Sequence, residues 1–126
     1  MSYSSITRIS SDHKVWQKSL EFYKEEIRNL QSRLTEVATK NTSFEARQGI
    51  EHFQNQFIVQ RNNIDELKHE MNHFADEVNH DVLHHTGHVN DLLVVEKKVL
   101  KEKYEDFERV MNGLRHEFND YLAKWM

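Results

Sequence analysis

The chain has 126 residues, of which 37% are apolar and 30% charged, and its net charge is −4 when histidine is neutral. A chain of this size corresponds to a single domain, residues 1–126. Acidic and basic residues are interleaved, so no strong positive field is available and nucleic acid is not an expected partner. Cysteine is absent, which excludes disulfides, thiol catalysis and cysteine-ligated metals.

The segment MSYSSITRISSDHK lacks the apolar run of a signal peptide. No later segment approaches the roughly 18 uninterrupted apolar residues of a membrane span. We therefore expect a soluble, cytoplasmic protein with no membrane partner.

Three stretches carry apolar residues at alternating steps of three and four, and no proline interrupts them. Such heptad spacing is typical of long helices that pack side by side as in coiled coils. The series run from Ile6 to Val37, from Ile50 to Val78 and from Leu100 to Trp125. The sequence thus predicts an all-α fold, an antiparallel up-down-up three-helix bundle.

The first helix is predicted over 10–38, with Ser10 or Ser11 as its N-cap. The second is predicted over 43–83, where Thr42 and Glu45 make a capping box. The third follows a break around 85–87 and covers 88–126. Asn63 and Glu66 read as a second capping box, so an alternative is a four-helix bundle in which the second helix splits at Asn62 and Asn63.

Antiparallel packing predicts which residues share a level. Two residues on the first and second helices lie at the same height along the bundle when their numbers add to about 82. For the second and third helices the sum is about 172. Gln60 then lies level with Tyr23 and Met111, and we expect a hydrogen bond between the Tyr23 hydroxyl and the Gln60 amide. His13 comes level with Met71 and Tyr104. The predicted buried polar residues, which would fix the register, are His13, Gln60, Tyr23 and Tyr104.

The chain is rich in histidine, with nine in total and six between residues 69 and 88. Residues 69–73 match the H-E-x-x-H pattern of zinc proteases, but both histidines fall opposite the stripe that contains Leu67, Met71 and Phe74. We expect no catalysis and no resident cofactor. A solvent-facing stripe remains as a candidate for adventitious zinc or nickel binding, formed by His69, His73, Asp76 and His80.

Four short segments carry a resemblance to a known family: Asp12-His13-Lys14, Glu51-His52-Phe53, His69 with Met71 and His73, and His116 with Asp120. In these the chain resembles hemerythrin-type oxygen and metal binders. The resemblance implies a metal site that uses His52, His69, His73 and their neighbours, and it requires the second helix to break at Asn62 and Asn63. The chain departs from the family at Gln56, where the family has glutamate, and at Asp120, which is one position too close to its histidine.

Several apolar residues lie off the stripe: Phe22, Ile58, Val59 and Val110, and in the third helix Leu92, Val95 and their apolar neighbours. They indicate either a broad core or a partner surface. We expect a non-enzymatic helical interaction or scaffold module that self-associates or binds another helical protein. The alternatives are a metal-binding bundle, hemerythrin-like or built on the histidine cluster, and a pH-responsive module based on the clustered histidines.

Overall fold

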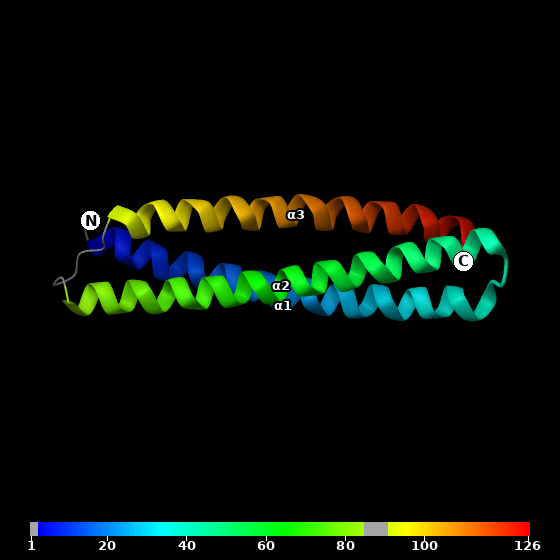
Figure 1. The fold of residues 1–126 in the computed structure, drawn as a ribbon, viewed down its shortest axis with the longest axis horizontal. Coiled ribbons are helices and arrows are strands. Elements are labelled where there is room, and N and C mark those ends of the chain that lie inside the picture. The colour runs from blue at the N-terminus through cyan, green and yellow to red at the C-terminus, as the bar shows by residue number, and fades with distance from the viewer. Residues whose placement is uncertain (1–2, 85–90) are drawn as a thin grey trace.

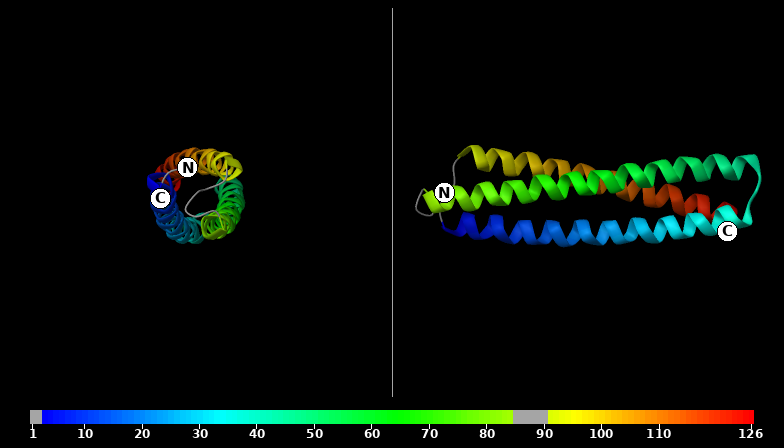
Figure 2. Two further views of the ribbon diagram at one scale, coloured as in Figure 1. Left: turned by 90° about the vertical axis from the view of Figure 1, so that its left-hand side faces the viewer. Right: turned by 60° about the horizontal axis from the view of Figure 1, so that its bottom comes forward.

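The computed structural model describes residues 3–84 and 91–126, with side chains for 9–81 and 91–126. Three long helices run up, down and up: α1 (Tyr3–Lys40), α2 (Phe44–His84) and α3 (Asp91–Trp125). They lie side by side along one common axis (Figures 1 and 2). The predicted all-α three-helix bundle is confirmed. No helix in the described part of the chain has both the length and the apolar character needed to cross a bilayer.

The helix ends differ in detail from the predicted ones. α1 begins at Tyr3 rather than near Ser10, because no glycine or proline interrupts the residues before the predicted cap. Ser43, not Thr42, caps α2: its Oγ accepts a hydrogen bond from the Ala46 amide at 3.2 Å. The predicted break at 85–87 and the predicted start at residue 88 lie outside the described residues.

α2 is one continuous helix through Asn62 and Asn63, so the split-helix alternative is wrong. A cap at Asn63 would require its side chain to accept a hydrogen bond from a backbone amide in the next turn. Instead the Asn63 Nδ2 donates to Gln60 Oε1 at 3.2 Å, one turn earlier in the same helix.

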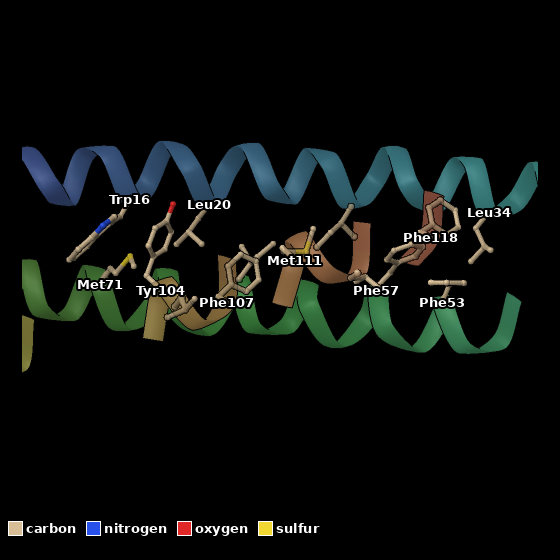
Figure 3. Close-up of a cluster of buried hydrophobic side chains, with 14 of the residues drawn as sticks. Trp16, Leu20, Leu34, Phe53, Phe57, Met71, Tyr104, Phe107, Met111 and Phe118 are labelled. Carbon is tan, nitrogen blue, oxygen red and sulfur yellow. The ribbon is translucent and has the colours of Figure 1, made fainter. Parts of the chain in front are cut away.

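The core follows the heptad stripes. The main cluster contains Trp16, Leu20, Phe57, Met71, Tyr104, Phe107, Met111 and Phe118 together with aliphatic neighbours from all three helices (Figure 3). A second cluster occupies the end where α1 begins and contains Ile9, Phe74, Val78, Leu93 and Leu100. Each stripe is therefore buried along nearly its whole length, as a coiled-coil arrangement requires.

The register between α1 and α2 differs from the predicted one. Lys24, predicted to lie opposite Ile58, forms an ion pair with Asp65 at 3.0 Å, one heptad further along α2. Glu21–Lys68 and Gln17–Asn72 follow the same register. Because the apolar stripe repeats every seven residues, registers one heptad apart bury the same kinds of residue, so the stripe does not choose between them.

A close contact between α2 and α3 occurs at Gly49. A Cβ atom added there would stand 2.7 Å from Cζ of Tyr121, well inside contact distance. The Tyr121 hydroxyl donates to the Ala46 carbonyl at 2.6 Å, and its ring packs against Phe53 with centroids 5.1 Å apart. Gly113 of α3 is different, because a Cβ there would meet no atom within 4 Å.

The two glycines therefore predict opposite effects of the same substitution. Gly49→Ala should lower the free energy of unfolding by about 1 to 2 kcal/mol, because the methyl group displaces the Tyr121 ring. Gly113→Ala should raise it by about 1 kcal/mol through helix propensity alone. Urea denaturation followed by circular dichroism measures both, and equal stabilisation by the two variants would contradict the close contact at Gly49.

Candidate functional site

The polar residues predicted for the core behave in different ways. Gln60 is buried, with 3% of its surface exposed. The Tyr23 hydroxyl does not bond Gln60 as predicted but donates to Glu108 Oε2 of α3 at 2.7 Å, because the register between α1 and α2 is shifted. Partial burial and this carboxylate raise the pKa of Tyr23. Tyr104 is buried beside Trp16, with ring centroids 6.0 Å apart.

His13 is half-buried rather than part of the core, which corrects the prediction. It lines a small hollow between α1 and α2 with Phe74 and Val78, and not with Met71 and Tyr104 as the predicted register required. Among the described residues, every fully buried side-chain nitrogen or oxygen has a hydrogen-bond partner. The described interior thus offers no unsatisfied polar group to a ligand.

The histidine stripe lies on the outside of α2. His69, His73, Asp76 and His80 are all exposed, as predicted. His73 Nε2 lies 2.7 Å from Glu77 Oε1. The Glu70 carboxylate of the H-E-x-x-H segment instead accepts from Lys103 Nζ of α3, at 3.2 and 3.3 Å. Within residues 9–81 and 91–126, no group of three or more histidine or acidic side chains is placed to hold a metal ion.

The arrangement implied by the hemerythrin resemblance also lacks its required break, since α2 is continuous. His52 is exposed on α2 and its Nε2 lies 2.8 Å from Glu117 Oε1 of α3. This pair joins two helices on the surface of the bundle.

All six residues of the predicted partner surface are exposed, and none of them belongs to the buried core. The exposed fractions are Phe22 65%, Ile58 53%, Val59 46%, Val110 49%, Leu92 76% and Val95 60%. They do not form one patch, however. Ile58 precedes Asp65, the partner of Lys24, by one heptad and therefore lies on the flank of α2 that faces α1. Phe22 lies one helical turn before Glu26, which pairs with Arg115 of α3 at 2.6 Å, and therefore lies on the flank of α1 that faces α3.

Val59 of α2 and Val110 of α3 lie opposite each other, between charged pairs that connect these two helices. One heptad along from them lies the pair of His52 with Glu117, and the pair of Glu45 with Lys124 follows at 3.7 Å. On the other side of the two valines lies Lys103, paired with Glu70. By helical spacing the two valines replace one charged pair in this series.

The most exposed predicted residues form a row on α3. Leu92, Val95 and Val99 are spaced by three and four residues, so they lie on one face over two turns, and Val99 is 45% exposed. We call these three residues the α3 row. Leu93, next to the row, faces inward and is buried. Val99 is one of the apolar neighbours of Leu92 and Val95 in the sequence, and its spacing places it in the same row.

A hollow of about 550 Å³ lies between the α3 row and the end of α2. It is lined by Asp76, Glu77, His80, Asp81, Leu92, Leu93 and Glu96. Partial burial and the nearby Glu77 carboxylate raise the pKa of Glu96, while His73 acts in the opposite direction. Negative charge is thus concentrated on the α2 side of the row.

Comparisons with known proteins add no relationship to these findings. No family model, no curated protein and no solved structure matches the chain.

The environment of Glu96 predicts a pH-dependent effect. Its pKa is raised in the folded protein, so ionisation opposes folding above that pKa, and the cost disappears at low pH, where the group is protonated in both states. Glu96→Gln should therefore raise the free energy of unfolding at pH 7, by no more than about 0.5 kcal/mol because the group is partly solvated. The gain should vanish near about pH 3.

Urea denaturation at the two pH values measures this gain, with Glu102→Gln as the control on an exposed position of the same helix. A gain for Glu96→Gln that is the same at both pH values, or shared by the control, would contradict the repulsion between Glu96 and Glu77.

Proposed function

We propose that this protein is a non-enzymatic helical interaction module that docks a partner helix on the α3 row and also self-associates weakly through it. The observation that carries the proposal is the exposure of Leu92, Val95 and Val99 on consecutive turns of one face. Contiguous apolar surface of this kind on a soluble domain typically marks an interaction site.

The size of the row sets the expected strength of self-association. Burial of the part of three aliphatic side chains that is now exposed contributes roughly 4 to 5 kcal/mol from each copy. Association itself costs at least about 4 kcal/mol in lost translational and rotational freedom. The α3 row alone therefore supports weak, reversible association, and tighter binding requires favourable contacts around the row.

The polar residues support an interaction role over catalysis. The buried polar side chains that we describe are satisfied within the bundle, and the pairs of His52 with Glu117 and of Glu70 with Lys103 connect α2 to α3. Acid–base or nucleophilic chemistry needs a base held beside a reactive group in a site that excludes water. The pairs described above instead join neighbouring helices.

Sedimentation equilibrium at high protein concentration tests the proposal. The natural chain should show weak monomer–dimer association. Val95→Lys should shift the equilibrium to monomer by placing a charge in the row. Ile58→Lys, a matched control on the flank that faces α1, should leave it unchanged. Circular dichroism checks that both variants fold. Equal loss of association in the two variants would contradict the assignment to α3.

A further inference from the structure

The two flanks of the α3 row carry different charges. Glu96 precedes Lys103, which pairs with α2, by one heptad, so the Glu96 flank faces α2. The described residues that line the hollow on this flank include four carboxylates and the imidazole of His80, and none of these described residues is a lysine or an arginine. The other flank faces α1, because Lys101 lies one heptad before Glu108, which accepts a hydrogen bond from Tyr23 of α1. Lys98 and Lys101 are both exposed on this flank.

From this asymmetry we propose that the α3 row and the adjoining hollow bind an amphipathic helix that carries lysine or arginine on the side facing α2. This inference rests on the proposed function and names the partner's chemistry. The apolar side of the partner covers Leu92, Val95 and Val99. Its cations enter the hollow beside Asp76, Glu77 and Glu96, where partial shielding from water strengthens their attraction.

A second copy of this chain fits the same surface less well. In a two-fold antiparallel pairing across the row, the same patch meets itself and the α2 flanks of both copies come to the same side. Four carboxylates of one copy then approach four of the other. Like charges placed together across an interface oppose association, which limits self-association to a weak equilibrium.

The ionisation of Glu96 is consistent with a cationic partner. Its raised pKa reflects partial burial and the nearby Glu77 carboxylate, which outweigh the opposite effect of His73. A bound cation would compensate for them. An acidic or anionic partner, including an anionic lipid surface, would add to the repulsion instead.

The two binding modes respond to salt in opposite directions. Screening weakens attraction between a cationic helix and the acidic flank, so that affinity should fall about severalfold between 50 and 300 mM salt. The same screening reduces repulsion between two copies, so self-association should rise or stay level. This difference in sign separates the partner from the homodimer.

The experiment uses two synthetic 18-residue amphipathic helices, one of leucine and lysine and one with glutamate in place of lysine, and fluorescence anisotropy with the full chain. We expect the lysine helix to bind and the glutamate helix not to bind. The double variant Glu77→Gln/Glu96→Gln should bind the lysine helix about tenfold more weakly and self-associate more strongly. The control Glu36→Gln/Glu51→Gln removes the same charge at exposed positions elsewhere and should bind unchanged.

The outcomes distinguish the partner's chemistry from the proposed function. Equal binding of both peptides, or equal weakening by the control variant, overturns the charge selection. Absence of peptide binding together with self-association that Val95→Lys abolishes overturns this inference and leaves the interaction module in place. A chain that binds neither peptide and remains monomeric overturns both.

Discussion

The apolar stripe of α2 packs against both other helices and so determines how the bundle is assembled. Phe57, Ile64 and Met71 are almost fully buried along it. α1 and α3 also meet through large side chains, such as Tyr23 and Phe107, whose ring centroids lie 5.4 Å apart. A polar residue is tolerated within the stripe only where it is satisfied, as Gln60 is by Asn63. Most apolar residues lie at the inward heptad positions, and the polar residues lie on the flanks of the helices.

The flanks then fix how the helices are set against one another. Lys24–Asp65 and Glu21–Lys68 hold α1 on α2, and the pairs of Glu45, His52 and Glu70 hold α3 on α2. Individual surface pairs contribute little free energy, but a shift by one heptad would set Lys24 opposite Ile58 and remove its acidic partner. Repeated pairing of opposite charges therefore selects one register among several that bury the stripes equally well.

The first turns of α3 depart from this division between inside and outside. Leu93 and Leu100 supply the inward stripe, yet Leu92, Val95 and Val99 add a second apolar face that is exposed. The acids of α2 stand beside this face on one side only. Apolar surface supplies the driving force of binding and the one-sided charge supplies its selectivity, so the two features together define an interaction site more narrowly than either does alone.

The sequence by itself determined the three helices and most of the residues that face inward, because heptad periodicity is a local property of the chain, but it left open whether the surplus apolar residues are buried or exposed. It also gave the outward position of His69 and His73. Tertiary structure decided the register of α1 on α2 and, with it, the partner of Tyr23. It also decided the contact of Tyr121 with Gly49 and placed Phe22, Ile58 and Val59 on different sides of the bundle. A seven-residue repeat is compatible with several registers, so only packing at the turns and pairing along the flanks distinguishes them.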